Sequence, residues 1–220
     1  MPQRRSARQV NRSDTAARLV SRHGTTWCEE AGIRLADKPS PLWRLFVLSL
    51  LLSARISSDI AVAAARELSK AGMRTPHATA QATWQQRVDA LGRGHYRRYD
   101  ERTSTQLGEA AQQLLDEDRG DLRRLRHRAD GDASVLEREL QRFKGVGPAG
   151  AAIFCREAQA VWTELSPYVD DLAADGAQRL GLPRSADALV RLVPARDVVR
   201  LVAGCVRAAR DDAVVDDIRG

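Results

Sequence analysis

Apolar residues recur with helical spacing along almost the whole chain, and hardly any segment alternates with the two-residue period of a strand. Residues 42–56 are apolar on most sides, which predicts a buried helix, and the Ser57–Asp59 segment is a cap for the next helix. Another helix, capped by Ser13 and Asp14, carries apolar residues as far as Trp27. Further amphipathic helices are predicted over residues 79–91, 103–115, 133–143, 171–180, 185–192 and 195–209. The pattern therefore predicts an all-α fold without internal repeats.

The length and the apolar content fit a chain that folds by itself. With 220 residues and 43% hydrophobic content, it can form one large or two small compact domains with a buried core. The longest apolar run, LFVLSLLLSA, is about half as long as a membrane-spanning helix and lies well inside the chain. Cys28, Cys155 and Cys205 are far apart and form no metal-binding pattern. We expect a soluble, cytoplasmic protein with reduced core thiols, no membrane partner and no metal site.

The charge balance favours a polyanionic partner. Lysine and arginine number 35 against 29 aspartates and glutamates, which gives a formal net charge of +6. Only Lys38, Lys70 and Lys144 are lysines, so a compositional preference for arginine accounts for part of this excess. Residues 1–13 are polar and basic, and we interpret them as a flexible arm. Charge by itself is compatible with nucleic-acid binding but does not establish it.

One glycine-rich stretch, FKGVGPAGAAIF at residues 143–154, raises the question of a nucleotide site. Gly145, Gly147 and Gly150 have the spacing of a dinucleotide-binding loop, but that loop follows a strand, and the residues before it have helical spacing. Pro148 suits the first position of a new helix. The stretch therefore predicts a helix-hairpin-helix turn whose backbone N–H groups face a DNA phosphate. The alternative is an ordinary tight link between two packed helices.

Three segments together resemble the helix-hairpin-helix DNA glycosylases of the endonuclease III superfamily. FKGVGPAGAA is similar to the family's L-P-G-V-G-x-x-x-A hairpin, LLSARISSD at residues 51–59 to its LLSAQ-x-x-D segment, and YVDDLAADGAQRLGLP at residues 168–183 to its V-D-x-H-V-x-R-x-x-x-R-L-G-L region. The segments occur in the family's order. The resemblance implies two helical lobes with a DNA-binding cleft: residues 14–38 plus 165–220 form one lobe, and residues 39–164, with the hairpin 143–150, form a helical barrel.

The same resemblance implies a partner and an activity. The partner is double-stranded DNA that contains a damaged or mismatched base, bound by a monomer associated with the nucleoid. The activity is that of a glycosylase of base excision repair, which turns the target base out of the helix and hydrolyses its N-glycosidic bond. A helix-hairpin-helix protein that binds DNA without chemistry is the alternative. The sequence does not identify the target base, because several helices contribute to the pocket.

The resemblance places the family's catalytic carboxylate at Asp170. Cleavage of an N-glycosidic bond builds positive charge at C1′ of the sugar, so a nearby carboxylate stabilises the transition state and can orient or deprotonate the attacking water. The helix dipole at Asp170 favours the ionised form. Asp171 is a competitor, but its side chain points about 100° away along the helix, and the alignment of RLGL at residues 179–182 selects Asp170. The alternative is that Asp170 only caps a helix.

The chain departs from bifunctional members of the family at one decisive position. Those members carry a lysine whose amine attacks C1′ and leads to strand cleavage, and Ala149 occupies this position here. Lys144, the nearest lysine, precedes the turn and is expected to contact a phosphate. We expect a monofunctional glycosylase, with a lyase that uses Lys144 as the alternative. The family's four-cysteine cluster is missing, so no iron–sulfur cluster or other cofactor is expected. Binding of a monovalent cation at the hairpin is left open.

The remaining expected DNA contacts come from the hairpin and from a wedge loop. The hairpin contacts are expected at Lys144, Gly145, Val146, Gly147, Ala149 and Gly150. The family's wedge loop corresponds to ALGRGHYRRYDERT, where His95 or Tyr96 is expected to project from a glycine turn and fill the gap left by the flipped base. The other expected backbone or wedge residues are Arg55, Arg93, Arg97 and Arg98. The alternatives are a basic loop that is merely solvated and a Tyr96 or Tyr99 that packs inside the protein.

Overall fold

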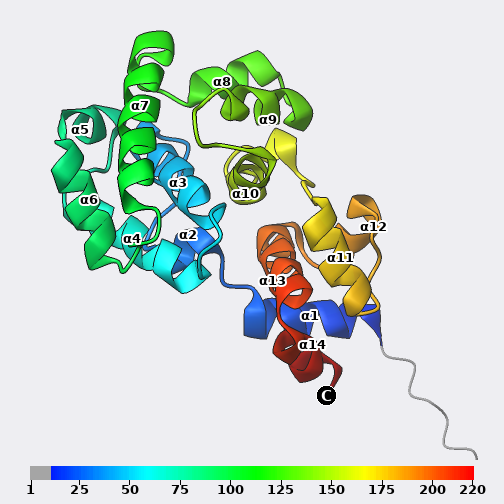
Figure 1. The fold of residues 1–220 in the computed structure, drawn as a ribbon. Coiled ribbons are helices and arrows are strands. Elements are labelled where there is room, and N and C mark those ends of the chain that lie inside the picture. Colours follow the sequence, from blue (N-terminus) through cyan, green and yellow to red (C-terminus); the bar gives the residue numbers. More distant parts are fainter. Residues whose placement is uncertain (1–10) are drawn as a thin grey trace, which may run out of the picture. The chain divides into compact units, whose positions relative to one another are not determined.

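The structure, a computed structural model, describes residues 11–220 (Figure 1). This part of the chain contains helices and no strand, which confirms the predicted all-α fold. Most of the predicted basic arm lies outside the described residues, but Asn11 caps the first helix, so residues 11–13 belong to that helix start and not to an arm. The helices are α1 (Arg12–His23), α2 (Trp27–Glu30), α3 (Pro39–Leu52), α4 (Ser58–Lys70), α5 (Pro76–Gln81), α6 (Trp84–Arg93), α7 (Asp100–Asp118), α8 (Arg123–Ala129), α9 (Ala133–Gln141), α10 (Pro148–Ala158), η1 (Thr163–Leu165), α11 (Asp171–Arg179), α12 (Ala186–Val190), η2 (Ala195–Asp197), α13 (Val198–Arg210) and α14 (Asp212–Arg219).

Capping side chains divide two of the predicted helices. The predicted helix over residues 79–91 is two helices, α5 and α6, because the backbone is extended at Ala82 and Thr83 forms a capping box with Gln86. The first predicted helix likewise ends at His23, and a capping box at Thr26 starts α2. Helices α8 and α14 were not predicted. Local capping thus overrides an apolar period that continues across the break.

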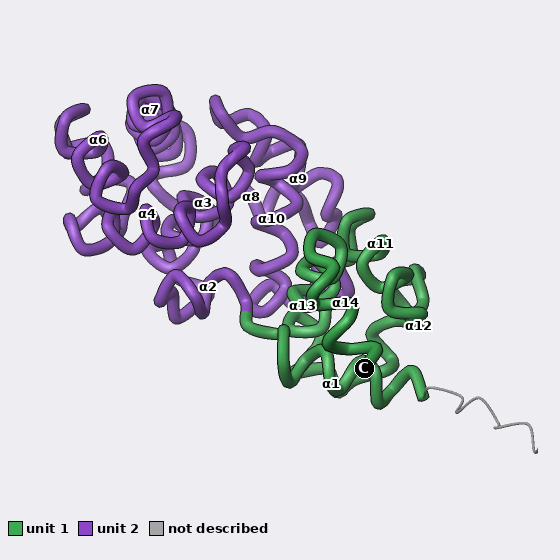
Figure 2. Tube along the Cα trace, turned by 60° about the horizontal axis from the view of Figure 1, so that its bottom comes forward, with its two compact units in different colours: residues 1–25, 169–220 green, residues 26–168 purple. Residues whose placement is uncertain are grey.

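The chain divides into two compact units (Figure 2). The smaller unit joins α1 to residues 169–220, and the larger unit comprises residues 26–168. Residues 26–38 and 165–168, expected in the terminal lobe, belong to the larger unit in the structure. The buried carboxylate of Glu157 explains part of this difference, because it accepts hydrogen bonds from the backbone N–H groups of Trp27 (3.2 Å) and Cys28 (3.0 Å).

Helix α3 is the centre of the larger unit. Ten of its fourteen residues are buried, as the apolar run predicted. Trp43 stacks on Phe46 with ring centroids 5.2 Å apart, and Phe46 meets the edge of Phe143 at 5.1 Å. Phe143 directly precedes the glycine hairpin. The core of the larger unit therefore extends to the hairpin itself.

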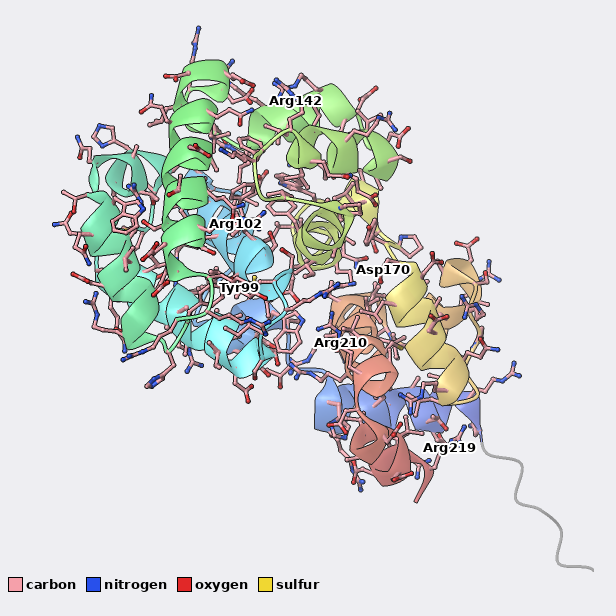
Figure 3. All side chains as sticks on the ribbon, viewed as in Figure 1. Tyr99, Arg102, Arg142, Asp170, Arg210 and Arg219 are labelled. Carbon is pink, nitrogen blue, oxygen red and sulfur yellow. The ribbon has the colours of Figure 1, made fainter. Side chains whose placement is uncertain are left out.

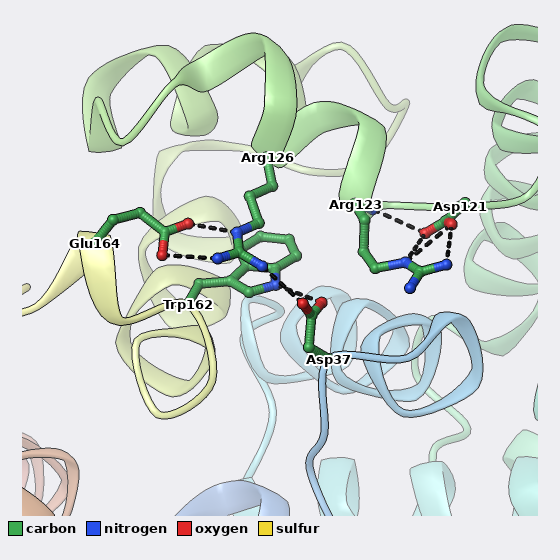
Figure 4. A network of polar contacts seen from close by, with 6 residues as sticks. All are labelled: Asp37, Asp121, Arg123, Arg126, Trp162 and Glu164. Atoms are coloured by element: carbon green, nitrogen blue, oxygen red, sulfur yellow. Dashed lines mark hydrogen bonds and ion pairs between the residues drawn. The ribbon is translucent and has the colours of Figure 1, made fainter.

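Ion pairs occupy most of the arginines of α8. Arg126 pairs with Glu164 and with Asp37, the latter at 2.7 Å, and Asp37 also accepts the indole N–H of Trp162 at 3.0 Å (Figure 4). Arg128 pairs in the same way with Asp118 and Glu139. These contacts tie α8 to the segment before α3 and to η1. The arginine-rich sequence of α8 therefore serves mainly to hold the larger unit together.

The smaller unit depends on close helix approach. A side chain at Gly176 would place its Cβ 1.8 Å from the carbonyl oxygen of Cys205, so α11 and α13 are in backbone contact at this point. Gly204 is packed against Leu19 of α1 in a similar way. His23 and Arg22 of α1 contact Asp217 of α14, each at 2.9 Å. Helix α11 is thereby packed against α13 at Gly176, and Asp170 stands at its start.

Replacing Glu157 by Gln should change how the stability of the larger unit depends on pH. Burial raises the pKa of Glu157 above its ordinary value of 4.5, and hydrogen bonds from Cys28 and Trp27 oppose this shift. The stability that this carboxyl contributes is therefore fully present below pH 4.5 and is lost as the pH rises through the folded pKa. We expect the Tm of the wild type, measured relative to Glu157→Gln, to fall as the pH rises above 4.5. A constant difference would contradict a titrating buried carboxyl.

Candidate nucleic-acid interface

The glycine hairpin has the geometry that the sequence predicted. Helix α9 ends at Gln141, Gly147 is the N-cap of α10, and Pro148 is its first residue. Val146 N–H bonds to the carbonyl of Phe143 at 3.0 Å, whereas the N–H groups of Gly145 and Gly147 donate to no backbone carbonyl among the described residues. The hairpin thus presents open backbone donors at a helix N-terminus, an arrangement that suits an anion.

The two glycines of the turn meet different requirements. Gly145 has φ +95°, and a Cβ there would lie 2.6 Å from the side-chain amide carbon of Gln106 on α7. Only glycine fits this position without strain. Gly147 has φ −98°, and a Cβ there would meet nothing within 4 Å. Gly145 is therefore required by the fold, while Gly147 leaves open space on the outside of the hairpin.

The side chains of the hairpin differ in what they can contact. Lys144 is exposed, and its Nζ lies 3.1 Å from Glu109 of α7. Ala149 is exposed in the first turn of α10, whereas Val146 and Gly150 are buried. Val146 and Gly150 were predicted to contact DNA; the Val146 N–H is used within the turn, whereas contact through the main chain of Gly150, in the first turn of α10, stays a prediction. The exposed part of the hairpin is consistent with contact through the main chain.

The predicted wedge loop presents His95 and not Tyr96. His95 is exposed with φ +63°, and Tyr96 is 0% exposed. The prediction that Tyr96 projects is therefore wrong, because its ring packs into the core of the larger unit. The turn is tight because Gly94 lies against the backbone of α4, where a Cβ would be 2.4 Å from Ala64 Cα.

The arginines of this region are paired to different extents. Arg93 lies 3.5 Å from Glu67. Arg97 is exposed, and the guanidinium of Arg98 lies 5.2 Å from the centre of the Tyr99 ring. Arg55 is exposed just after α3 and makes no ion pair among the described residues. Arg55, Arg97 and Arg98 are thus available for an external anion.

A cavity in the larger unit brings several of the predicted residues together. It has a volume of about 280 Å³ and lies where the end of α3, the start of α7 and the hairpin meet. Three of its lining residues, Arg55, Tyr96 and Gly145, are expected from the sequence. Arg102 was not expected, although its helical spacing to Gln106 places both on one face of α7. The lining residues are Leu50, Ser53, Ala54, Arg55, Tyr96, Tyr99, Arg102, Thr103, Gln106 and Gly145.

Asp170 is the N-cap of α11 in the smaller unit (Figure 3). Its Oδ1 accepts a hydrogen bond from the N–H of Ala173 at 3.1 Å, and its side chain is half-buried. Asp171 is the first residue of the helix and is exposed. The two neighbouring carboxylates therefore differ in environment, and the capping contact belongs to Asp170.

The described residues provide no obvious metal site and no membrane span. Among residues 11–220, no group of three histidine, cysteine, aspartate or glutamate side chains is placed to hold a metal ion. Cys28, Cys155 and Cys205 are buried and form no disulfide among the described residues, and burial raises the pKa of Cys205 to about 12. No helix in this part of the chain has the length and apolar character needed to cross a bilayer.

Comparison with known proteins identifies the fold. No protein-family model matches the sequence, and a search of curated proteins finds no match. The solved structure of a trapped endonuclease III–DNA covalent intermediate, an estranged-adenine complex, is similar with a TM-score of 0.52. The match covers 89% of this chain and 81% of that chain at 16% sequence identity. The protein therefore has an all-α, endonuclease III-like fold.

Alanine at each of the two hairpin glycines should separate folding from binding. Gly145→Ala forces a strained φ and a contact with Gln106, so we expect it to lower the free energy of unfolding by about 1–3 kcal/mol. Gly147→Ala should leave the Tm nearly unchanged but weaken duplex binding several-fold, because its methyl occupies the space in front of the open donors. Thermal melting and fluorescence anisotropy measure the two effects.

The loss of affinity in Gly147→Ala should be equal for damaged and undamaged duplexes, since phosphate contacts carry no base information. A changed preference between duplexes at constant overall affinity would argue against a phosphate-binding hairpin.

Proposed function

We propose that this protein is a monofunctional DNA glycosylase of base excision repair. The observation that carries the proposal is the half-buried carboxylate of Asp170 at the start of α11, in a chain with an endonuclease III-like fold. The open hairpin donors of Gly145 and Gly147 supply a place for the DNA backbone. The substrate is double-stranded DNA with a damaged or mismatched base, bound by a monomer that associates with the nucleoid.

The reaction breaks the bond between C1′ of the sugar and the ring nitrogen of the base. The bonding electrons leave with the base, and positive charge develops on the sugar, which the carboxylate of Asp170 stabilises. Water then adds to C1′ as it transfers a proton to Asp170, directly or through a second water, and this proton passes through solvent to the departing base, so that Asp170 is ionised again. Free base and an abasic site are the products.

The larger unit supplies the DNA contacts in this proposal. Main-chain donors of the hairpin hold a phosphate, and Arg97 and Arg98 approach the backbone nearby. His95, held outward at φ +63°, enters the gap that the target base leaves in the stack. Because the residue is exposed and its turn is fixed by Gly94, it can be inserted without unfolding the loop.

Two observations favour hydrolysis without strand cleavage. Ala149 has no amine to attack C1′, whereas endonuclease III has been trapped as a covalent intermediate with DNA. The Nζ of Lys144 lies 3.1 Å from Glu109 on α7, so its amine contacts that carboxylate. The abasic product would then pass intact to a separate enzyme.

A DNA-binding protein without glycosylase activity is the second candidate. It is favoured by the hydrogen bond from Ala173 to Asp170, since helix capping by itself gives this carboxylate a structural role. The two candidates differ in what Asp170 does to the rate of base release.

Asp170→Asn should abolish base release and leave the fold intact. Asparagine caps helices as well as aspartate does, so α11 should persist, while the loss of negative charge should slow base release at least about 100-fold. DNA binding should be equal or stronger, because a charge that repels phosphates is removed. The measurement is single-turnover release from duplexes with oxidised pyrimidines, alkylated purines, or mismatched thymine or uracil, followed by alkali.

Two matched variants control for this change. Asp211 is the N-cap of α14 in the same unit, and its side chain accepts a hydrogen bond from the N–H of Ala213 at 2.9 Å. Asp211→Asn should therefore leave base release unchanged. Asp171→Asn should have a small effect. Turnover of Asp170→Asn at near the wild-type rate would exclude the catalytic role, and a large loss at Asp171 would reassign it.

Borohydride should trap no covalent adduct between the wild-type protein and a substrate that it processes. A Schiff base needs an amine at C1′, and Ala149 provides none. Strands should break only after alkali or an abasic-site endonuclease is added. We expect Lys144→Ala to behave as the wild type does and Ala149→Lys to gain an adduct. An adduct of the wild type that disappears in Lys144→Ala would show lyase chemistry at Lys144.

A further inference from the structure

The cavity between α3, α7 and the hairpin contains a buried polar group without a partner. The hydroxyl oxygen of Tyr96 is buried and makes no hydrogen bond among the described residues. Thr103 also lines the cavity and lies near enough to Tyr96 to lower the pKa of its hydroxyl slightly against the larger effect of burial, but the two side chains do not meet the distance and angle of a hydrogen bond. Burial raises the pKa of Tyr96, so its hydroxyl keeps its proton at neutral pH and can donate. Such an unsatisfied group lowers stability unless something else bonds to it.

The other lining groups combine apolar surface with a few polar atoms. Leu50 and Ala54 contribute apolar surface, and Tyr99 contributes an aromatic ring. The hydroxyl of Ser53 and the amide of Gln106 provide further donors and acceptors. A planar ring with hydrogen-bonding groups at its edge matches this lining, because such a ligand needs apolar walls and few, fixed polar contacts.

The cavity also borders positive charge and open backbone donors. Arg55 and Arg102 are exposed, and neither makes an ion pair among the described residues, in contrast to Arg126 and Arg128 of α8. Figure 3 marks Tyr99 and Arg102 at the start of α7. Gly145 belongs both to the cavity wall and to the hairpin. A ligand here therefore has a ring inside and an anionic group outside, as a nucleotide does.

We propose that this cavity binds one nucleobase, with the attached phosphate at the hairpin and at Arg55 or Arg102. The hydroxyl of Tyr96 bonds to the edge of the base, and the exposed side chain of Arg102 moves aside to admit it. This inference rests on the DNA binding included in the proposed function. It adds a base-binding position that uses no residue of the smaller unit, and hence none of the proposed hydrolytic site.

The experiment uses duplexes that cannot be hydrolysed. A tetrahydrofuran abasic analogue replaces the target nucleotide, and 2-aminopurine replaces each neighbouring or opposing base in turn. The fluorescence of 2-aminopurine rises when it leaves the base stack, so one position should brighten when the full-length protein binds. Because the target base is absent, the signal reports a second base. No chemistry is required, so failure of this test is distinct from failure of the glycosylase assay.

Tyr96→Phe should reduce binding and increase stability at the same time. Removing the hydroxyl should abolish most of the 2-aminopurine signal and weaken duplex binding roughly fivefold to tenfold. It should also raise the Tm by about 2–4 °C, because an unsatisfied buried group is lost. Tyr168→Phe is the matched control: its hydroxyl bonds to Glu137 at 2.6 Å, outside the cavity, and the signal should persist.

A second pair of variants tests the charge at the cavity. Arg102→Gln should weaken the 2-aminopurine signal, whereas Arg124→Gln should not, although Arg124 is exposed and has no ion pair among the described residues. If Tyr96→Phe and Arg102→Gln still bind the duplexes and give an unchanged 2-aminopurine signal, the cavity does not bind a base of DNA.

Titration with the four deoxynucleoside monophosphates, followed by calorimetry, distinguishes the source of the base. One outcome is that a free nucleotide binds to the wild type but not to Tyr96→Phe, while no 2-aminopurine signal appears with the duplexes. This outcome would support a cavity that binds a base through Tyr96, with a mononucleotide as its ligand. No binding in either experiment would overturn the proposal.

Discussion

The burial of α3 is the constraint on which the larger unit depends. Each fully buried leucine or phenylalanine of this helix contributes about 1.5–3 kcal/mol relative to an exposed side chain, and ten residues of α3 are buried. The same helix determines where the candidate interface lies. Its aromatic side chain Phe46 contacts Phe143 just before the hairpin, and Arg55 follows its C-terminal end. Core and interface are therefore parts of one packed arrangement.

Helix α7 is the second support of the interface. Gln106 packs against the backbone of Gly145, and Glu109, three residues further on, pairs with Lys144. Contacts on one face of α7 thus hold two consecutive hairpin residues. A substitution at Gln106 or Glu109 is therefore expected to change how the hairpin presents its backbone N–H groups. A substitution at Gly145 is expected to disturb the cavity wall.

The arginines of the larger unit serve two purposes that the sequence does not separate. Arg126 and Arg128 form ion pairs with carboxylates from other elements, so their charge is largely satisfied within the protein. Arg55, Arg97 and Arg102 are exposed and make no ion pair among the described residues. The positive net charge of the chain is therefore less informative than the location of its exposed arginines, of which Arg55 and Arg102 line the cavity.

The sequence determined those features that depend on neighbouring residues. Helical periodicity predicted the all-α fold and the buried α3, and the glycine and proline spacing at residues 143–150 predicted the hairpin, because both arise from local backbone geometry. The family resemblance pointed to Asp170, whose cap is also a local contact. It left open which of the adjacent residues His95 and Tyr96 projects, and the structure shows that His95 is exposed and Tyr96 is buried.

Only the tertiary structure decided which polar side chains remain available. Pairing of Arg126 with Asp37 joins residues 89 positions apart, and the contact of Gln106 with Gly145 likewise brings distant segments together. The cavity arises from three such segments and leaves no pattern in any one of them. The physical reason is that burial and charge pairing depend on neighbours in space, which sequence spacing specifies only within a helix or a turn.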